Sequence, residues 1–234
     1  MLYKTNWIKG AINCLGDNIN ESSFKVEDGD IKFKSLNRSH TVIYELFIDN
    51  IVINDNIKGN IDTEVLKSVF GRVKVKDKLN IFVDPDNFVV EVLGNIHKEF
   101  KISQTGLDQE FNEIETPPSI PTETVKVSLK DFLEVLKDVK AFNDKFILEY
   151  ERDIIKVSTE GDQTNNIFEI ETEGDLQEGR SVYSLSLVLD SIKQIKAIDD
   201  LFIGFGFDTP LKIVSRFEDS YYSACVAPRI ETED

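Results

Sequence analysis

The chain is poor in cysteine, histidine, tryptophan and methionine. Its 234 residues include two cysteines, two histidines, one tryptophan and one methionine. Cys14 and Cys225 have neither disulfide-framework nor zinc spacing, which favours two reduced, mostly buried thiols in a cytosolic protein. His40 and His97 accompany no nucleophile signature, and we interpret His40 as a packing or hydrogen-bonding residue. The glycines of "GFGFD" (204–208) lie in a strand pattern with no helix after it, so they do not form a dinucleotide-binding loop.

Long apolar runs are also absent. No stretch approaches the ~18 apolar residues of a membrane-spanning helix. The first residues, "MLYKTNWIKG", lack the apolar core of a signal peptide. With 41% hydrophobic and 30% charged residues, the composition is typical of a globular protein. We therefore expect a cytoplasmic protein with no membrane partner, folded as one large or two small domains.

Basic residues are outnumbered by acidic ones. Lysine and arginine total 27 against 43 aspartates and glutamates, which gives a net charge of −16. This excess alone argues against nucleic-acid binding, because contacts with phosphate need lysine or arginine. The position of the positive charge along the chain is the better guide, since a basic surface can form on an acidic protein.

Half of the six prolines gather in one acidic segment, "LDQEFNEIETPPSIPTETVKV" (107–127). Pro117, Pro118 and Pro121 forbid a helix and favour extended chain. The segment is therefore interpreted as a linker that crosses between two domains. The predicted organisation is an N-terminal domain at 1–106, a connecting loop at 107–123 and a C-terminal domain at 124–234.

The two halves repeat one pattern. Each has two amphipathic helices at matching positions, and alternating strands fill the space between them. The first helix is expected in 6–17, with Trp7 packing at its start. The pattern predicts an α+β fold dominated by sheets. The four helical stripes are Ile8, Ala11, Ile12 and Leu15; Leu66, Val69, Phe70 and Val73; Phe132, Val135, Leu136 and Val139; and Val188, Ser191, Ile192 and Ile195.

Basic side chains recur on the outer flanks of these helices. One interpretation is an ordinary solvated face, in which acids such as Glu134 and Asp138 pair with neighbouring lysines. The other is a basic surface for sequence-independent contact with phosphates. Repetition at equivalent positions favours the second. The residues are Lys9, Lys67, Lys137 and Lys193 on one flank, Lys74, Lys140 and Lys196 near the helix ends, and Arg72 and Lys130 on outward faces.

Two strand patterns carry opposite charge. "HKEFKIS" (97–103) is mostly basic, whereas "NNIFEIETEGD" (165–175) is acidic. If both form sheet edges, each can pair with the other strand on a second copy, and this head-to-tail contact can close a ring. Two ordinary surface strands are the alternative.

Several segments resemble sliding clamps of the proliferating cell nuclear antigen (PCNA) type, above all the archaeal members. They cover essentially the whole chain, and their order and spacing are more specific than any one of them. They are "KSLNRSHTVIYELFI", "DTEVLKSVFGRVKVKDKLNIF", "IETPPSIPTETVKVSLKDFLEVLKDV", "RSVYSLSLVLDSIKQI" and "TPLKIVSRF…VAPRIETED". The resemblance implies a DNA-clamp fold of two similar domains, assembled as a homotrimeric ring that encircles duplex DNA in the nucleoid. It implies no catalytic residue, cofactor or metal.

The resemblance also assigns roles to residues. Polymerase, clamp loader, nuclease and ligase would dock through short peptides beneath the connecting loop. The DNA-facing set would be Lys9, Lys67, Arg72, Lys74, Lys137, Lys140, Lys193 and Lys196. The peptide groove would use Leu36, His40, Ile114, Ile120, Pro121, Pro210, Leu211, Ala227, Pro228, Arg229 and Ile230. The subunit contact would set Lys98, Phe100 and Lys101 against Ile167, Glu169 and Glu171.

Three other interpretations remain open. The chain could be one subunit of a heterotrimeric clamp, or a monomeric acidic scaffold that does not encircle DNA. A hydrolase using Asp84 and Asp86 is the third, although Asp-Pro-Asp is also a common hairpin turn. In the last segment, 223–234, Pro228 is expected to end a strand, so that the chain leaves the sheet and borders the groove.

Overall fold

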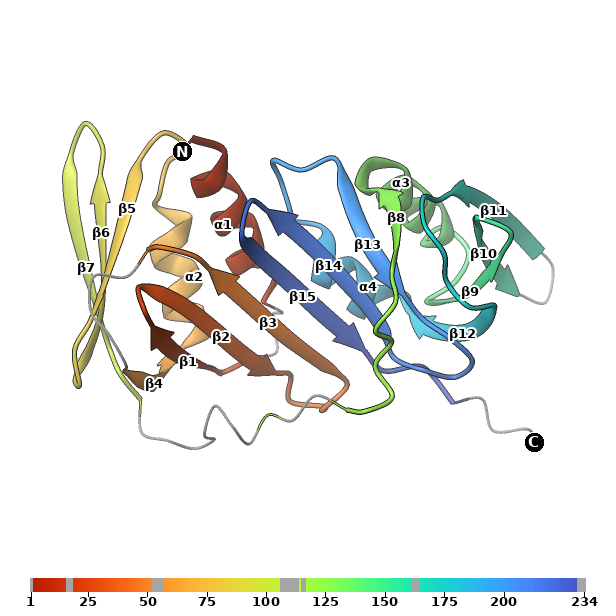
Figure 1. Cartoon of the computed structure of the whole chain (residues 1–234), viewed down its shortest axis with the longest axis horizontal. Coiled ribbons are helices and arrows are strands. Elements are labelled where there is room, and N and C mark those ends of the chain that lie inside the picture. The colour runs from red at the N-terminus through yellow and green to blue at the C-terminus, as the bar shows by residue number, and fades with distance from the viewer. Residues whose placement is uncertain are drawn as a thin grey trace. The chain divides into compact units, whose positions relative to one another are not determined.

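A computed structural model describes residues 2–15, 19–51, 57–105, 114, 117–160 and 165–230 (Figure 1). Its helices and antiparallel sheets confirm the predicted α+β class. The chain divides into two compact units, whereas the exact domain boundaries stay a prediction. The first unit comprises Met1–Glu115, Gln194–Ala197 and Arg216–Tyr222, and the second comprises Thr116–Lys193, Ile198–Ser215 and Ser223–Asp234.

The first unit contains two helices and two groups of antiparallel strands. One group has the order β4-β1-β2-β3, and the other has the order β5-β6-β7. The sequence of β4, "KGNID", has little intrinsic strand preference, and it forms a strand by pairing with β1. The elements are α1 (Leu2–Cys14), β1 (Glu21–Glu27), β2 (Asp30–Leu36), β3 (Val42–Ile48), β4 (Lys58–Asp62), α2 (Thr63–Gly71), β5 (Lys78–Val83), β6 (Asn87–Leu93) and β7 (His97–Ser103).

The helix α1 begins earlier than predicted. It spans Leu2–Cys14, so Trp7 lies within it and not at its start. The reason is that the buried stripe extends one turn back from Ile8, to Thr5, whose hydroxyl donates to the carbonyl oxygen of Asp77 at 3.0 Å. Trp7 is fully buried, and its ring stacks on Phe217 with the centroids 6.1 Å apart.

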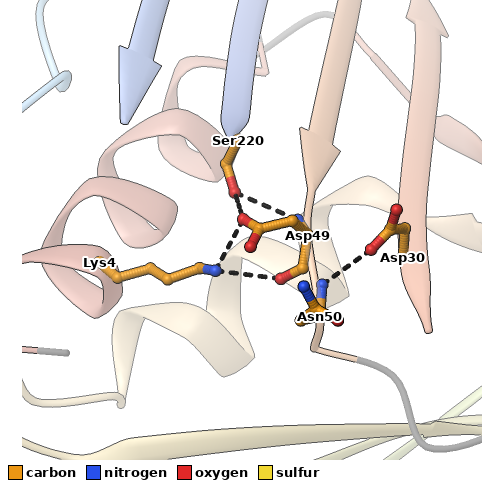
Figure 2. A network of polar contacts seen from close by, with 5 residues as sticks. All are labelled: Lys4, Asp30, Asp49, Asn50 and Ser220. Atoms are coloured by element: carbon orange, nitrogen blue, oxygen red, sulfur yellow. Dashed lines mark hydrogen bonds and ion pairs between the residues drawn. The ribbon is translucent and has the colours of Figure 1, made fainter. Parts of the chain in front are cut away.

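A polar network holds α1 against the end of β3 (Figure 2). Lys4 Nζ donates to the carboxylate of Asp49 at 2.7 Å and to its carbonyl oxygen at 3.0 Å. The hydroxyl of Ser220 donates to the same carboxylate and accepts from the Asp49 N–H at 3.1 Å. Partial burial raises the pKa of Asp49, but the hydrogen bonds from Lys4 and Ser220 outweigh it and bring the pKa below its ordinary value.

The second unit repeats the plan with helices that follow directly on strands. Its strands have the orders β11-β10-β9-β12 and β8-β13-β14. The last residues of β14 and the first of β15 belong to the first unit. The elements are β8 (Val125–Ser128), α3 (Leu129–Val139), β9 (Lys145–Glu151), β10 (Ile154–Glu160), β11 (Asn165–Glu171), β12 (Gly179–Ser184), α4 (Leu185–Ile192), β13 (Asp200–Gly204), β14 (Leu211–Phe217) and β15 (Ser220–Val226).

One helix in each unit, α2 in the first and α3 in the second, starts with a side-chain cap. The Asp62 carboxylate accepts from the N–H of Val65 at 2.9 Å at the start of α2. The Ser128 hydroxyl accepts from the N–H of Asp131 at 3.2 Å at the start of α3. Both bonds satisfy amide groups that a helix N-terminus leaves unpaired. Within each unit the two helices contact one another, α1 with α2 and α3 with α4. None of the helices in the described ranges has the length and apolar character needed to cross a bilayer.

Candidate nucleic-acid interface

In the first unit, Lys9, which was predicted to face DNA, caps the C-terminal end of α2. Lys9 Nζ donates to the carbonyl oxygen of Gly71 at 3.1 Å and to that of Val73 at 2.9 Å. These carbonyls lie at the C-terminal end of α2, where a helix has unpaired acceptors and partial negative charge. Lys9 therefore acts as a C-terminal cap of α2, which limits its reach toward a phosphate.

The Lys67 side chain is also less exposed to solvent, and so less accessible to DNA, than the helical pattern predicted. Its side chain is 11% exposed, and its ammonium lies 3.7 Å from the carboxylate of Glu64. The expectation of an outward-facing side chain is therefore wrong for Lys67, because the pattern could not show what covers that flank. Arg72, Lys74 and Lys196 are exposed as expected.

The position of Lys196 depends on a close approach of two backbones. A Cβ placed on Gly10 would lie 2.5 Å from the carbonyl oxygen of Gln194 and 3.2 Å from the N atom of Lys196. Glycine therefore lets α1 contact segment 194–197. This contact brings Lys196 beside the turn of α1 that carries Lys9.

In the second unit, three predicted lysines meet around one hollow. The hollow lies between the end of α3 and the length of α4, and its volume is about 700 Å³. Lys137 and Lys140 are exposed on the α3 side, and Lys193 is exposed just past the end of α4. The full lining is Lys137, Lys140, Ala141, Phe142, Asn143, Asp144, Leu185, Ser186, Leu189, Asp190 and Lys193.

The acidic groups of this hollow are already paired. The Asp190 carboxylate lies 2.6 Å from the Lys193 ammonium, and the Asp144 carboxylate lies 3.0 Å from the Arg229 guanidinium. Lys137 and Lys140 form no ion pair with any residue that the structure describes, so the alternative interpretation, in which Glu134 and Asp138 pair with them, does not hold there. The charge that remains at the hollow is positive, on a chain whose net charge is −16.

The residues predicted for the peptide groove belong to both units. In the first unit, Leu36 ends β2 and is half-buried, and His40 is exposed with φ 57° in the following turn. The turn is shaped by Asn37, whose Oδ1 accepts from the N–H groups of Thr41 and Val42 at 2.8 and 2.9 Å. Ile114 is 4% exposed, and its carbonyl oxygen accepts from Lys34 Nζ at 3.2 Å.

In the second unit the groove residues differ in exposure. The Pro121 carbonyl oxygen accepts from Lys212 Nζ at 3.2 Å, which fixes this part of the connecting loop to β14. Leu211 is fully buried and belongs to the core, whereas Ile230 is 86% exposed. The remaining groove residues, Ile120, Pro210, Ala227, Pro228 and Arg229, are half-buried.

The tail does not leave the fold immediately after Pro228. As predicted, β15 ends before this proline, at Val226. However, the N–H of Arg229 donates to the carbonyl oxygen of Val182 in β12 at 2.7 Å, and the Arg229 side chain pairs with Asp144. The expectation that the chain separates from the sheet at Pro228 is therefore wrong by at least one residue, because proline removes only its own donor and the next amide can still pair.

The strands of opposite charge are both sheet edges within their units. Among the described residues, β7 pairs only with β6, and β11 pairs only with β10. Their side chains alternate in the same exposure pattern, and each buries one isoleucine, Ile102 or Ile170, near its end. The six residues predicted for a subunit contact lie on these edges, and Ile167 is 68% exposed. Their role in a contact stays a prediction.

The Asp-Pro-Asp segment forms a hairpin turn between β5 and β6. The Asp84 carboxylate accepts from the N–H of Asp86 at 2.9 Å and from the N–H of Asn87 at 2.7 Å. These bonds hold the pKa of Asp84 below its usual range. Across the described ranges, no three histidine, cysteine, aspartate or glutamate side chains cluster as metal ligands would. The Asp84 carboxylate therefore serves the turn.

Similarity to known proteins extends over the whole chain. The DNA polymerase sliding clamp of Methanobrevibacter smithii is 25% identical over 236 residues, which cover 97% of this chain and 96% of the relative. The PCNA of Thermococcus kodakaraensis has a TM-score of 0.84 at 20% identity, with coverage of 96% and 97%. A PCNA2–PCNA3 complex from Sulfolobus tokodaii contains a chain with a TM-score of 0.82 at 20% identity, with coverage of 97% and 98%. No family model matches the chain.

These similarities agree with the fold that the sequence predicted. The solved structures share the two-unit α+β architecture, which is that of the sliding clamps.

The sequence analysis missed two features of the site, Phe142 and the ion pair of Asp144 with Arg229. The only signal for Phe142 was an aromatic residue inside a lysine-rich stretch, "KDVKAFND", directly after a helix.

Proposed function

We propose that this chain, a sliding clamp of the PCNA type, is a DNA polymerase processivity factor that closes with further copies into a ring around duplex DNA. The observation that carries the proposal is the extent of the similarity. The sliding clamp of Methanobrevibacter smithii aligns with 97% of the chain in sequence, and the PCNA structure of Thermococcus kodakaraensis aligns with 96% of it in fold. Because both units match, the proposal concerns the entire described architecture and not a shared subdomain.

Contact with DNA would be made by the exposed basic residues near the helix ends. Arg72, Lys74 and Lys196 in the first unit and Lys137, Lys140 and Lys193 in the second are exposed. Lysine contacts with phosphate carry no sequence information, so they position a duplex without fixing it at one site. The net charge of −16 keeps the total attraction to DNA weak, which allows sliding. In a closed ring, topology rather than affinity keeps the protein on its template.

Ring closure would use the two edge strands. β7 offers Lys98 and Lys101, and β11 offers Glu169 and Glu171. An edge strand has unpaired N–H and C=O groups, so β7 of one copy can pair with β11 of the next. The opposite charges favour this pairing over that of two β7 or two β11 edges. A homotrimer is the assembly that we propose.

Partner proteins would dock by short peptides beside the connecting loop. The exposed Ile230 and the half-buried Ala227 and Pro228 form an apolar tail on which an extended peptide can pack or pair. Polymerase, clamp loader, nuclease and ligase are the partners that we propose for this groove, together with His40 in the first unit. In this role the chain catalyses no reaction itself and acts at the nucleoid.

The experiment measures assembly and tethering separately. Native mass spectrometry should give three times the 26.7 kDa of one chain. Lys101→Glu should reduce that assembly, Glu169→Lys should do the same, and mixing the two variants should restore pairing between them. With a clamp loader, the wild-type protein should raise the length of DNA made per binding event on primed circular templates. A single-chain mass at micromolar concentration together with no stimulation would contradict the proposal.

A heterotrimeric clamp is the second candidate. It is favoured by one comparison, in which a chain of similar fold belongs to a complex of two different PCNA proteins. In that case the isolated chain would be monomeric or dimeric and would form a ring only when a second, different clamp subunit is added. The mass measurement therefore separates the two candidates.

A further inference from the structure

We propose that the hollow between α3 and α4 binds an unpaired nucleotide, whose base stacks on Phe142 and whose phosphates contact Lys137 and Lys140. This inference goes beyond the contact of the same lysines with duplex DNA. It rests on the proposed function only in that DNA reaches this face of the helices.

The hollow has an apolar floor and an exposed aromatic ring. Phe142 lies directly after α3, and its side chain is 54% exposed. Leu189 and the buried Leu185 contribute from α4. A volume of about 700 Å³ lies within the usual range of small-ligand sites. An aromatic ring that is half open to solvent at such a site can stack on a flat partner, and every nucleobase offers a flat face.

The positive charge around Phe142, on Lys137 and Lys140, favours an anionic ligand. Asp190 and Asp144 are neutralised by Lys193 and Arg229 at 2.6 and 3.0 Å. Lys137 and Lys140 stay without an ion pair in the part of the chain that the structure describes. Two unpaired ammonium groups beside an apolar floor match a ligand with a flat apolar body and a negative backbone. A nucleotide has both features.

The turn that carries Phe142 is fixed before any ligand binds. The N–H of Phe142 donates to the carbonyl oxygen of Val139 at 2.9 Å. Asn143 Nδ2 donates to the carbonyl oxygen of Glu160 at 2.9 Å, which ties the turn to β10. The carbonyl oxygen of Asp144 accepts from the N–H of Leu185 at 2.9 Å, which ties it to α4. Because these bonds fix the backbone of the turn, its ordering costs little on binding, and more of the stacking energy appears as affinity.

The ligand must be unpaired, because bases within a duplex are stacked on each other and their faces are covered. Only a single strand, a strand end or an extruded nucleotide exposes a face to Phe142. A free deoxynucleoside triphosphate has the same chemistry and is the other possible source. An acidic peptide with aromatic residues is a different class of ligand, which we do not propose.

The test compares two exposed phenylalanines of the same unit. Phe207 is 69% exposed and does not line this hollow, so Phe207→Ala is the matched control. The probe is a fluorescent single-stranded oligodeoxyadenylate of about six nucleotides, measured by anisotropy at low salt. We expect Phe142→Ala to weaken binding about tenfold, and Phe142→Tyr and Phe207→Ala to leave it within about twofold. The variant with both Lys137→Gln and Lys140→Gln should weaken binding and reduce its salt dependence.

Three further measurements identify the source of the ligand and challenge the proposal. Binding of fluorescent dATP without binding of the oligonucleotide probe would assign the site to free nucleotides. An equal loss of duplex and single-strand binding in Phe142→Ala would overturn the proposal, as would unchanged single-strand binding in that variant. Stronger binding of a peptide of alternating glutamate and phenylalanine would overturn it as well. The oligonucleotide reaches the hollow on a single chain, so the result does not depend on ring assembly or on polymerase stimulation.

Discussion

The two units hold equivalent helices but use their lysines differently. In the first unit, Lys4 pairs with Asp49, Lys9 caps α2, and Lys67 is largely covered beside Glu64. In the second unit, Lys137 and Lys140 are exposed around an apolar hollow. Lys4 and Lys9 therefore stabilise the fold of the first unit, where Lys74 and Lys196 stay exposed, whereas Lys137 and Lys140 of the second unit are available to a ligand. Sequence repetition indicates equivalent positions, but the neighbours of each position decide its role.

The largest expected effect concerns the close contact that α1 makes in the first unit. Gly10→Ala places a Cβ 2.5 Å from the Gln194 carbonyl oxygen, so the helix or segment 194–197 must move. We expect a loss of about 2 to 3 kcal/mol in the free energy of unfolding, measured by denaturant titration. Gly71→Ala is the control, because nothing lies within 4 Å of its added Cβ. It should leave stability unchanged or raise it by about 0.5 kcal/mol. Equal losses of stability in both variants would show that the close contact with Gln194 is not what requires glycine at position 10.

The next effect tests the polar network around Asp49. Its carboxylate is stabilised by Lys4 and Ser220, and its pKa lies below the ordinary value of 3.8. The stabilisation is therefore complete above that value and is lost as the pH falls through the lower pKa of the folded state. We expect Asp49→Asn to reduce the free energy of unfolding by about 1 kcal/mol at pH 7.

The pH dependence separates this charge effect from a packing effect. The difference between wild type and Asp49→Asn should shrink as the pH is lowered below about 4, where the carboxylate of the unfolded chain is protonated before that of the folded protein. A difference that stays constant from pH 7 to pH 3 would mean that shape, and not charge, accounts for the loss.

A direct comparison of the two units comes from one substitution made in each. Lys9→Met removes the cap of α2 and should cost about 1 kcal/mol of stability. Lys137→Met removes an exposed charge without an ion pair and should change stability by less than about 0.5 kcal/mol. Circular dichroism during denaturant titration measures both.

Binding to duplex DNA should show the opposite order. Lys137→Met should lower the slope of log affinity against log salt by about 1, whereas Lys9→Met should change it less, because the Lys9 ammonium is already bonded to α2. If the two variants lose equal stability and equal salt dependence, the contrast between the units is not correct.

The smallest effect concerns the start of the tail in the second unit. The ion pair of Arg229 with Asp144 joins side chains that are 40% and 77% exposed, so solvent screens it. We expect Arg229→Ala to change the free energy of unfolding by no more than about 0.5 kcal/mol. Lys193→Ala removes the other paired cation of the hollow and is the matched control. A loss above 1 kcal/mol for Arg229→Ala alone would indicate that the tail contributes to the core.

Much of the fold could be predicted because its signals are local. The stripes of Leu66 and Phe70 in α2 and of Phe132 and Leu136 in α3 all become buried. The start of α1 could not be placed in the same way, because Thr5 joins the buried stripe only through its contact with Asp77. The sequences of β4 and β12 could not identify them as strands for a similar reason. Each forms by pairing with a distant strand, β1 or β9, and not by its own preference.

The candidate site was predictable only as a set of positions. A helical wheel shows which lysines share a flank, and it placed Lys137 and Lys140 correctly on an exposed face. It cannot show that Lys9 reaches the carbonyls of α2, because those acceptors are 62 and 64 residues away along the chain. Nor can it show that Phe142 opens into a hollow with α4. Both features arise from contacts between elements that the sequence separates.

The opposite charges of the edge strands β7 and β11 affect which way the copies in an assembly face. When a contact between two different strands closes a ring, a rotation about the ring axis relates successive copies, so every copy points the same way. Such an assembly has two chemically distinct sides, and all copies of the tail at 227–230 lie on the same one. In the proposed ring, a protein bound to the tail would therefore meet the DNA from a single side. An edge that paired with itself would have turned alternate copies over and removed this polarity.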